Sequence, residues 1–477
     1  MFKIKRNGVY RARLVAQGYS QIKGIDYDEN FSPVIKDTCH RLIMAFILAN
    51  KKWKKTITDV ETAFLYGELD RTIFMKIPPG YTEIKEEMSK QTDSHYDLKN
   101  LECLILKKSI YGLVQAARAW WKNLWKELKK IRFEKCVKDG CLFRRKDKMG
   151  EVVICAYVDD MLIVGDEVAV DKTHEELRKS FKIVVEEATE FLGCKWIESE
   201  KGYVIHQPHI LMKLESSFLE EVKEMKEYAT PSGESYRVNR VQENEPYLSP
   251  TQQTRYRSGI GIALYLSRFS RPDICNATRE LSKGMIKANE AHYKQLLRLI
   301  KYIIDTKQLM LKIELKEGNW KMSGFCDSDF AGDNDTRKSI SGYIIYLNGM
   351  IVSYRSKGQN IVTLSSTEAE YVAATDMVID ILFIKHIMDF LEVKLTLPIM
   401  VNIDNKGATF LANNEYASQR TKHIDVKYHF IRQHIEEGTI KTNLIKSEEN
   451  PSDVFTKNLG HNLFWKHVNN MMEWNKN

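Results

Sequence analysis

The sequence predicts an α+β protein with more than one domain, and three observations support this fold class. The 477 residues are too many for a single core, so roughly two to four domains are expected. With 43% hydrophobic and 29% charged residues, the composition is that of a globular protein. Both kinds of element are indicated: apolar runs flank a polar step at 154–165, helical patterns follow from about 253 to 306, and strands and helices mix from near 310 to about 458.

The polar step at 154–165, "ICAYVDDMLIVG", contains two adjacent aspartates, Asp159 and Asp160. Two strand-like runs around such a step predict a β-hairpin. Asp is a common turn residue because its side chain hydrogen-bonds nearby backbone, so the pair alone favours a plain turn. A third carboxylate, Asp59, ends a β-like run in "TITDVETAFLYGELDRTIFMKIPPGY" at 56–81. Brought together, the three carboxylates would suit two Mg²⁺ ions, because Mg²⁺ prefers hard oxygen ligands.

A second set of acids lies at the ends of predicted elements in the C-terminal block. Its members come from "SGFCDSDFAGD" (323–333), "VTLSSTEAEYVAATDMV" (362–378), "MVNIDNKGA" (400–408) and "SEENPSDVFTKNL" (447–459). They are Asp327, Glu370, Asp404 and Asp453. Four acids on a strand, a helix, a strand and a short helix suit a two-metal nuclease site.

Two positions of this second set have rivals nearby. Asp329 and Asp333 compete with Asp327 for the strand position. In the helix, Ser365 and Glu368 have the spacing of a capping box, which gives Glu368 a structural role at the helix start. Glu370 is therefore the expected site residue of that helix.

The charge distribution favours a polyanionic partner. The net charge is +8, and residues 1–60 hold twelve Lys or Arg against five Asp or Glu. Residues 118–135 are also basic and include Trp120, Trp121 and Trp125. Basic stretches with aromatic neighbours suit nucleic acid, although a solvated helix face with its tryptophans in the core is nearly as good an interpretation.

The remaining composition points to a reducing compartment inside the cell. Eight cysteines occur singly and none forms a CxxC pair, which argues against structural zinc and disulfides. The N-terminus lacks the apolar region of a signal peptide, and no membrane span is expected. Residues 84–98 are expected to be a surface insertion, residues 223–252 a connection, and residues from 459 a peripheral tail.

Several motifs in the same order resemble the reverse transcriptase of copia-type LTR retrotransposons. They are "YRARLVAQGYSQIKGIDYDENFSPV" (10–34), "DVETAFLYGEL" (59–69), "KSIYGLVQAARAW" (108–120), the hairpin with YVDD, "FLG" (191–193) and "YRSGIGIALYLSRFSRPDI" (256–274). The acids of the second set are similar in order to those of RNase H, whose register favours Asp327. The resemblance implies a right-hand polymerase with fingers, palm and thumb, followed by an RNase H-like α/β domain. Its implied boundaries are 1–222 for fingers and palm, 223–309 for a thumb or connection, 310–458 for RNase H and 459–477 for a tail.

The resemblance also implies a role for each site residue. Asp59, Asp159 and Asp160 would be the polymerase metal ligands, and the second set would be those of the nuclease. Phe64 matches the aromatic position that excludes a ribose 2′-hydroxyl, with core packing as the alternative. The other implied substrate-binding residues are Arg11, Arg13, Gln115 and Tyr157, the two arginines being alternatives for the triphosphate.

The implied function is RNA-directed DNA polymerase with ribonuclease H activity, using Mg²⁺ or, as a substitute, Mn²⁺. The implied partners are an RNA template, a DNA primer, their hybrid and dNTPs, with integrase or other Pol products as further candidates. The implied location is a cytoplasmic virus-like particle, with the nucleus as an alternative. Three positions depart from the family pattern: Glu61, Val114 and Ala117. The chain also begins inside the fingers, so the competing interpretation is a truncated remnant that only binds nucleic acid or keeps RNase H activity alone.

Overall fold

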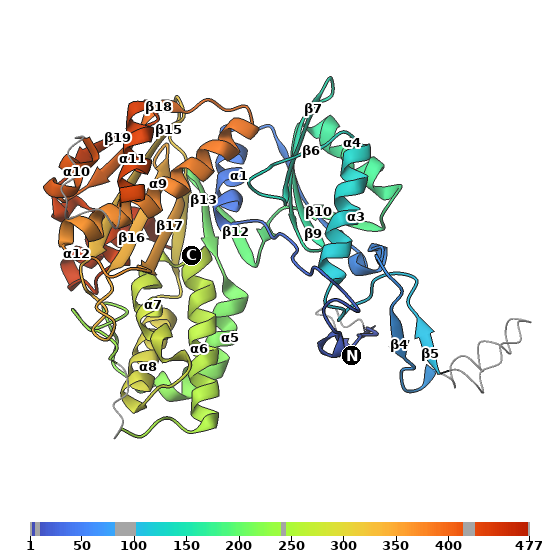
Figure 1. The fold of residues 1–477 in the computed structure, drawn as a ribbon, viewed down its shortest axis with the longest axis horizontal. Helices are drawn as coiled ribbons and strands as arrows, with labels where there is room; N and C mark the ends of the chain where they lie inside the picture. The colour runs from blue at the N-terminus through green and yellow to red at the C-terminus, as the bar shows by residue number, and fades with distance from the viewer. Residues whose placement is uncertain (1, 5–9, 82–101, 240–244, 414–424, 476–477) are drawn as a thin grey trace, which may run out of the picture. The chain divides into compact units, whose positions relative to one another are not determined.

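The computed structural model describes all residues except 1, 5–9, 82–101, 240–244, 414–424 and 476–477 (Figure 1). The chain divides into two compact units, residues 1–35 with 52–187 and residues 36–51 with 188–477. Each unit contains helices and sheets, which agrees with the predicted mixture of α and β structure. The predicted insertion at 84–98 lies outside the described residues. None of the helices in the described ranges has the length and apolar composition of a membrane span.

A six-stranded antiparallel sheet forms the centre of the first unit (Figure 1). Its strands, in spatial order, are β10 (Ile183–Glu187), β3 (Lys54–Val60), β9 (Asp160–Gly165), β8 (Gly150–Tyr157), β7 (Leu142–Asp147) and β6 (Glu134–Lys135). The apolar residues 152–156 and 161–164 of β8 and β9 are buried. Helix α4 (Glu167–Arg178) packs against these two strands. The continuous apolar runs that predict strands are therefore the core of this sheet.

The predicted hairpin at 154–165 is confirmed. Tyr157 at the end of β8 pairs with Asp160 at the start of β9, which leaves Val158 and Asp159 in the turn. Val158 has a φ of +56°, a backbone conformation that β-branched residues rarely adopt. The indole of Trp120, in helix α3 (Ala116–Lys130), donates a hydrogen bond of 2.5 Å to the Val158 carbonyl. The buried Trp120 side chain thus stabilises the conformation of the turn.

Short elements complete the first unit. Strand β1 (Phe2–Ile4) pairs with β2 (Tyr10–Ala12), and β4 (Phe74–Lys76) pairs with β5 (Cys103–Ile105). The single-turn 3₁₀ helices are η1 (Gly18–Ser20) and η2 (Ala63–Tyr66). Because η2 begins three positions after the end of β3, it places Phe64 just beyond the end of that strand.

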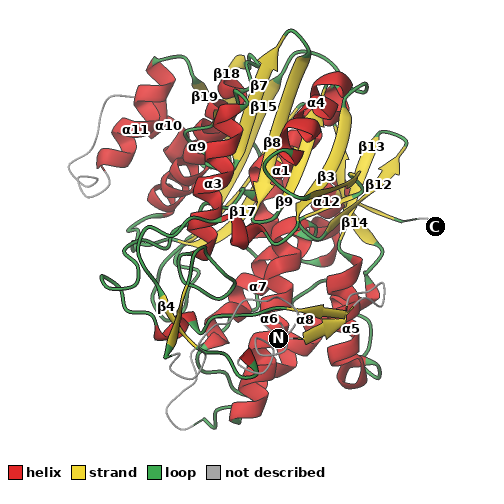
Figure 2. Cartoon of the chain, turned by 90° about the vertical axis from the view of Figure 1, so that its right-hand side faces the viewer, coloured by secondary structure: helices red, strands yellow, loops and turns green. Residues whose placement is uncertain are grey.

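A five-stranded mixed sheet is the centre of the second unit (Figure 2). Its order is β17 (Met350–Gly358), β16 (Ile340–Leu347), β15 (Lys321–Asp329), β18 (Thr396–Ile403) and β19 (Ile440–Leu444). The first three strands are antiparallel, and β15, β18 and β19 are parallel. Helix α9 (Ser366–Phe390) packs on β15 and β16, with α10 (Lys406–Asn413) and α11 (Asp425–Glu436) beside it. Because β15, β17 and β18 run in the same direction, their carboxyl ends lie at one edge.

The rest of the second unit is a helical bundle and a second sheet. The bundle contains α5 (Pro208–Val222), α6 (Pro250–Phe269), η3 (Pro272–Ile274), α7 (Cys275–Ser282), η4 (Lys283–Met285) and α8 (Glu290–Asp305), largely where the sequence predicts helices. The antiparallel sheet contains, in order, β11 (Glu190–Phe191), β12 (Cys194–Ser199), β13 (Gly202–His206), β14 (Leu309–Glu314) and β20 (Met472–Trp474). Helix α12 (His461–Met471) and the 3₁₀ helices η6 (Ser447–Glu449) and η7 (Pro451–Phe455) follow the mixed sheet along the chain.

Three segments lie where the sequence does not place them. Residues 36–51 and 188–222, expected with the fingers and palm, pack within the second unit. The first contains α1 (Asp37–Ala49), which packs on β17 and β14, and the second contains β13, which pairs with β14. The expectation of a peripheral tail is wrong for 461–474, because α12 buries Phe464, Val468 and Met471 and β20 pairs with β14.

Candidate metal centres

The three aspartates of the first unit lie at the ends of adjacent strands. Asp59 of β3 and Asp160 of β9 are directly paired across the sheet, and Asp159 lies in the adjoining turn. Burial, together with the negative charges of Asp159 and Asp59, raises the pKa of Asp160 to about 6. The three carboxylates therefore share an electrostatic environment in which a cation would stabilise the ionised forms.

A stack of side chains surrounds the predicted substrate residues of the first unit. The guanidinium of Arg13 lies 4.4 Å from the ring centroid of Tyr111. Tyr111 in turn meets Phe64 edge to face, with centroids 4.9 Å apart. Phe64 also packs against the apolar cluster that contains Leu113. Sequence reasoning brought Arg13 and Phe64 forward separately and missed Tyr111, which joins them.

The remaining predicted substrate residues differ in what their side chains contact. Gln115 is buried, and its amide donates to the Asp26 carbonyl at 3.1 Å and accepts from Gln21 at 3.1 Å. The ring of Tyr157 is 39% exposed beside the aspartates. The side chain of Arg11 lies outside the described part of the structure. Gln115 is therefore engaged within the protein at both ends of its amide.

The basic segment at 118–135 uses its tryptophans for packing. The Trp120 ring contacts the rings of Tyr66 and Phe181, at centroid distances of 6.2 and 5.2 Å. The ammonium of Lys135 lies 4.7 Å from the centroid of Trp121 and 4.9 Å from that of Trp125. Of the two interpretations of this segment, the contacts support tryptophans that hold the helix against its own unit.

The second set of acids gathers at the carboxyl edge of the mixed sheet. Ligand atoms of Asp327, Glu370 and Asp404 all lie within 4.8 Å of one another. Within the described ranges, this is the group of three or more acidic, His or Cys side chains whose ligand atoms all lie that close together. The ligand atoms of Asp59, Asp159 and Asp160 therefore do not all lie within 4.8 Å of one another. Asp327 ends β15, Glu370 lies in the first turns of α9, and Asp404 follows β18. The structure thus brings together three residues separated by up to 77 positions in the sequence.

A lysine, Lys457, links Asp453 to Asp327. Lys457 Nζ lies 3.1 Å from Asp327 Oδ1 and 3.4 Å from Asp453 Oδ1. The Thr456 hydroxyl donates a hydrogen bond to Asp327 Oδ2. Sequence reasoning missed Lys457, although its spacing of four residues from Asp453 is the distance at which helical side chains pair.

A glycine lets η7 carry Asp453 to this edge. Gly342 of β16 pairs with Asp327 across the sheet. A Cβ atom on Gly342 would lie 2.6 Å from Thr456 Cγ2 and 2.9 Å from Phe455 Cβ. The absence of a side chain therefore allows the segment after Asp453 to lie directly on the sheet.

The rivals of Asp327 and Glu370 are held by other partners. Asp329 pairs with Arg237, and Asp333 lies 2.8 Å from Lys283. Ser365 caps α9 by accepting from the Glu368 N–H at 3.2 Å, and the Glu368 carboxylate accepts from the Leu364 N–H at 2.6 Å. The predicted capping role of Glu368 is thus confirmed in substance. Its carboxylate reaches one residue farther back than in a full capping box.

The chemistry of the cluster at the mixed sheet fits a divalent cation. Burial, together with the charges of Asp453 and Asp404, raises the pKa of Asp327 to about 7, although Lys457 opposes this rise. Burial also raises the pKa of Glu370 well above its usual range, and the charges of Asp327 and Asp404 add to the effect. Glu370 Oε1 accepts from the Ser328 N–H at 3.1 Å, but the buried Oε2 has no hydrogen-bond partner. A hard cation would satisfy this oxygen and stabilise the charged carboxylates.

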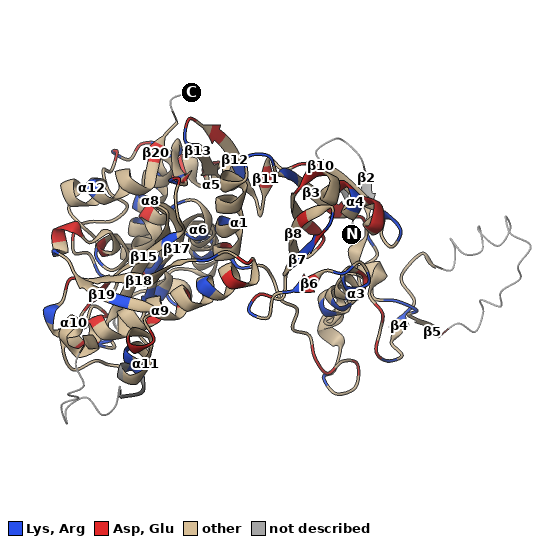
Figure 3. Cartoon of the chain, turned by 90° about the horizontal axis from the view of Figure 1, so that it is seen from above, with Lys and Arg blue, Asp and Glu red and all other residues tan. Residues whose placement is uncertain are grey.

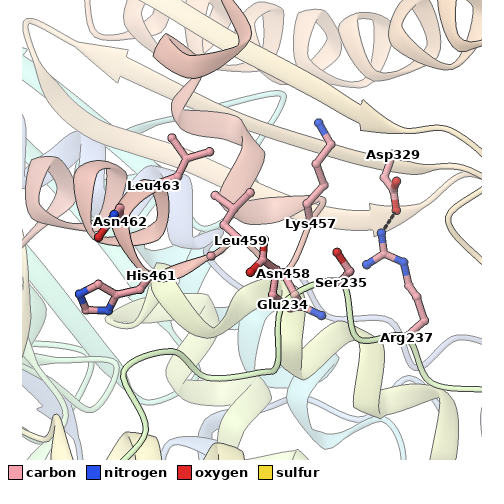
Figure 4. A pocket seen from close by; sticks show the side chains of 11 residues that line it. Glu234, Ser235, Arg237, Asp329, Lys457, Asn458, Leu459, His461, Asn462 and Leu463 are labelled. Atoms are coloured by element: carbon pink, nitrogen blue, oxygen red, sulfur yellow. Dashed lines mark hydrogen bonds and ion pairs between the residues drawn. The ribbon is translucent and has the colours of Figure 1, made fainter.

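Two open cavities flank this cluster. One of about 660 Å³ is lined by Arg237, Asp329 and Lys457 together with residues 458–463 (Figure 4). The other, of about 630 Å³, is lined by Asp404, Lys406 and Lys446 among others. Two Lys or Arg side chains line each cavity, next to acidic residues that include Glu234 in the first and Glu448 in the second.

Comparison with known proteins agrees with these observations. Residues 1–231 match the family described as reverse transcriptase (RNA-dependent DNA polymerase). The chain is 34% identical to the Retrovirus-related Pol polyprotein from transposon RE1 of Arabidopsis thaliana, over 95% of this chain and 30% of that protein. It is 33% identical to the Retrovirus-related Pol polyprotein from transposon TNT 1-94 of Nicotiana tabacum, over 97% of this chain and 34% of that protein. The chain therefore spans about a third of the length of these relatives.

A solved structure of the foamy viral protease-reverse transcriptase in complex with dsDNA also matches. It is 11% identical, with a TM-score of 0.19, and the match covers 83% of this chain and 68% of that chain. Residues 1–231 belong to the reverse transcriptase family, in a chain that is similar over most of its length to the Pol polyproteins of copia-type transposons.

Proposed function

We propose that the chain is an RNA-directed DNA polymerase that also cleaves the RNA strand of RNA/DNA hybrids. The observation that carries the proposal is the presence of two separate carboxylate centres. One lies in the hairpin of the reverse transcriptase domain, and the other lies at the edge of the mixed sheet. A polymerase joined to a nuclease for hybrids suits an enzyme that copies RNA and then removes the template. Its substrates would be an RNA template, a DNA primer, dNTPs and the hybrid.

The arrangement of helices and strands supports an assignment of domains. The antiparallel sheet with the hairpin of Asp159 and Asp160 suits a polymerase palm. The mixed sheet, with α9 across β15 and β16 and acids at its carboxyl edge, suits an RNase H-like domain. We place the palm and fingers in the first unit, residues 1–35 and 52–187, a thumb or connection in 223–309 and the RNase H-like domain in 310–458.

In the polymerase centre, Asp59, Asp159 and Asp160 would hold Mg²⁺, with Mn²⁺ as a substitute. When bound, two such ions stabilise the attacking and leaving oxygens of an in-line phosphoryl transfer. Arg13, stacked on Tyr111, would orient the triphosphate, since a guanidinium binds two oxygens at once. The Phe64 ring, packed against Tyr111, would exclude a 2′-hydroxyl and thereby select deoxynucleotides.

In the nuclease centre, Asp327, Glu370, Asp404 and Asp453 would hold Mg²⁺ while Lys457 balances charge between Asp327 and Asp453. The lysine and arginine side chains in the cavities beside the cluster would bind the sugar–phosphate backbone. Hybrids of this kind are recognised mainly by groove shape and 2′-hydroxyls, so binding should weaken steeply with salt. We propose a cytoplasmic virus-like particle as the location, with integrase or other Pol products as partners.

A nuclease with an impaired polymerase is the second candidate. Its support is the amide of Gln115, which the resemblance assigns to dNTP binding and which is fully engaged by Gln21 and Asp26. The departures Val114 and Ala117 flank this glutamine. The acids of the nuclease centre show no comparable departure.

Primer extension on poly(rA) with oligo(dT), in Mg²⁺ and separately in Mn²⁺, tests the proposal, together with cleavage of a labelled RNA/DNA hybrid. The controls are the double variant Asp159→Asn, Asp160→Asn and the single variant Asp404→Asn. Extension lost only in the double variant, with cleavage lost only in Asp404→Asn, is the expected result. Cleavage without extension by the unmodified chain would favour the nuclease alone. A folded chain that binds the hybrid but shows neither extension nor cleavage would be a remnant that only binds nucleic acid.

A further inference from the structure

A cavity of about 630 Å³ in the second unit has no role in either carboxylate centre. Residues of α6, α7 and β17 line it, together with Asp37 at the start of α1. Three of the lining residues are the arginines Arg268, Arg279 and Arg355, and Asp37 is the one acidic residue of the lining. Serine and tyrosine hydroxyls complete the wall. A pocket of this composition is suited to an anion.

The single carboxylate of this cavity is outnumbered by cations. Asp37 lies 2.6 Å from the Arg41 guanidinium and 3.2 Å from that of Arg268. Burial opposes the ionisation of Asp37, yet the charges of Arg41, Arg268 and Arg355 keep its pKa below the usual range. Asp37 thus faces the positive charges of Arg41, Arg268 and Arg355, while the third arginine of the lining, Arg279, is paired with Glu280 at 2.8 Å.

A glycine keeps one wall of the cavity bare. Gly261 lies in the middle of α6, where glycine destabilises a helix relative to alanine. A Cβ atom at Gly261 would meet no atom within 4 Å, so packing does not require glycine there. On the same helix, a Cβ atom at Gly259 would lie 3.0 Å from Leu296 and 3.2 Å from Phe218. Gly259 is explained by packing, whereas Gly261 leaves the surface of α6 open beside the cavity.

The cavity lies along the same sheet edge as the nuclease centre. Ser356 of β17 pairs with Gly342 of β16, which pairs with Asp327 of β15. Two strand spacings therefore separate this wall from Asp327, which is about 10 Å. Figure 3 shows Lys and Arg in blue near β17 and α6.

Side chains connect the cavity to the carboxylates. Arg279 Nε donates to Ser356 Oγ at 3.0 Å. Burial lowers the pKa of Arg279, and the carboxylate of Glu280, 2.8 Å away, opposes this effect. Arg237 pairs with Asp329, two residues beyond Asp327, and both line the cavity next to Lys457 in Figure 4. Two ion pairs, Arg279–Glu280 and Arg237–Asp329, therefore lie between the cavity and the cluster.

We infer that this cavity binds phosphodiester groups of the nucleic acid that is cut at Asp327, Glu370 and Asp404. The inference rests on the proposed nuclease function and adds a second anchoring site to it. The guanidinium groups of Arg268 and Arg355 bind phosphate oxygens in pairs, and hydroxyl groups of the wall donate to the same backbone. Gly261 admits the phosphate to the surface of α6.

Salt-dependent binding of an RNA/DNA hybrid tests the site. The full chain carrying Asp404→Asn is titrated with a fluorescent hybrid over a series of salt concentrations. Adding Arg268→Ala or Arg355→Ala should weaken binding several-fold and lower the slope of log K against log salt by about one. Lys213→Ala is the matched control, because it removes one charge from an exposed position on α5. Unchanged slopes in both arginine variants would overturn the inference.

A variant that leaves every charge in place tests the shape of the cavity. Gly261→Leu should fill the bare wall, weaken hybrid binding several-fold and leave the melting temperature equal or higher. Gly261→Ala should raise the melting temperature with a smaller loss of binding. If Gly261→Leu binds as tightly as its parent, the ligand does not approach α6 and the inference is wrong.

Modified hybrids identify the strand that is bound. Uncharged methylphosphonate linkages are placed in the DNA strand, or in a 2′-O-methylated RNA strand. Neutral linkages in the strand that occupies the cavity should make the hybrid affinities of Arg355→Ala and its parent equal. The other strand should leave the difference in affinity unchanged. An unmodified chain that cleaves hybrids, with arginine variants that keep the salt slope, would refute the cavity alone. A chain that neither binds nor cleaves hybrids would refute the proposed function as well.

Discussion

The ammonium of Lys457 lies 3.1 Å from Oδ1 of Asp327, so a positive charge of the chain itself balances a buried carboxylate. The same ammonium lies 3.4 Å from Asp453. Two acids that repel each other are thereby held at one edge of the sheet. Removing one partner from such a group leaves uncompensated buried charge, which destabilises a fold.

Lys457→Met should therefore lower the melting temperature in EDTA, and added Mg²⁺ should raise it more than in the unmodified chain. A divalent cation replaces the lost positive charge, and a ligand that binds the folded state stabilises it. Thermal unfolding with and without Mg²⁺ measures both effects. Lys441→Met, at an exposed position of β19, is the control. Equal Mg²⁺ shifts in the two variants would contradict the role of Lys457.

Gly342→Ala should impair the nuclease centre and spare the polymerase. The new Cβ atom would lie 2.6 Å from Thr456 and 2.9 Å from Phe455, so the segment that carries Asp453 must move. Overpacking of this kind costs about 1–3 kcal/mol. Gly358→Ala is the matched control, because a Cβ atom there meets nothing within 4 Å. Hybrid cleavage and primer extension are compared in both variants, and equal cleavage would refute the argument.

Trp120→Phe should loosen the turn that carries Asp159. The variant loses the 2.5 Å hydrogen bond to the Val158 carbonyl and keeps an aromatic ring in the core. We expect a loss of about 1 kcal/mol in stability and a lower rate of primer extension. Trp121→Phe is the control, since it loses an equivalent bond of 3.0 Å to the Gly140 carbonyl. If both variants slow extension equally, the bond to the turn has no special effect.

Local patterns in the sequence predicted the parts of the structure that depend on neighbouring residues. The hairpin at 154–165 follows from two apolar runs and a polar step, and the start of α9 follows from Ser365 and Glu368. The clustering of Asp327, Glu370 and Asp404 was also expected, because acids at the ends of adjoining elements meet at one edge. Each of these predictions needed only short-range information or a known order of strands.

The parts that were missed depend on contacts between distant segments. Helix α1 packs against β17 of the second unit, although 300 residues lie between them in the chain. The segment 461–474 was expected to be a peripheral tail, yet its apolar side is buried and β20 pairs with β14. Gly342 is ordinary in a strand until η7 is placed on it. No local pattern identifies such partners.

Phe64→Ala should reduce the discrimination between deoxyribonucleotides and ribonucleotides. The half-buried ring lies beside Tyr111, and its removal would admit a 2′-hydroxyl. We expect the ratio of kcat/KM values for dNTP and rNTP to fall on the order of 10- to 100-fold. Leu65→Ala, at the neighbouring exposed position, should leave the ratio unchanged. A lower melting temperature with an unchanged ratio would assign Phe64 to core packing.

His40 should make the second unit sensitive to acid. Its ring is buried between Phe191 and Trp196, at centroid distances of 5.5 and 5.6 Å. Burial and the charge of Arg41 lower its pKa from 6.5 to about 3. The folded state therefore favours the neutral ring, whereas the unfolded chain takes up a proton as the pH falls below 6.5. The stability is fully present above that pH and declines toward pH 3.

The contribution of His40 should amount to roughly 1.4 kcal/mol per pH unit within that window. His40→Phe keeps an aromatic ring but cannot be protonated, so its urea midpoint should fall less steeply between pH 6.5 and 4 than that of the unmodified chain. His461→Phe, at an exposed position, should leave the slope unchanged. Tryptophan fluorescence reports both transitions, since Trp196 lies against His40. Parallel pH curves for His40→Phe and the unmodified chain would mean that His40 stays neutral in both states or is charged in both. In either case its burial would not be the source of acid sensitivity.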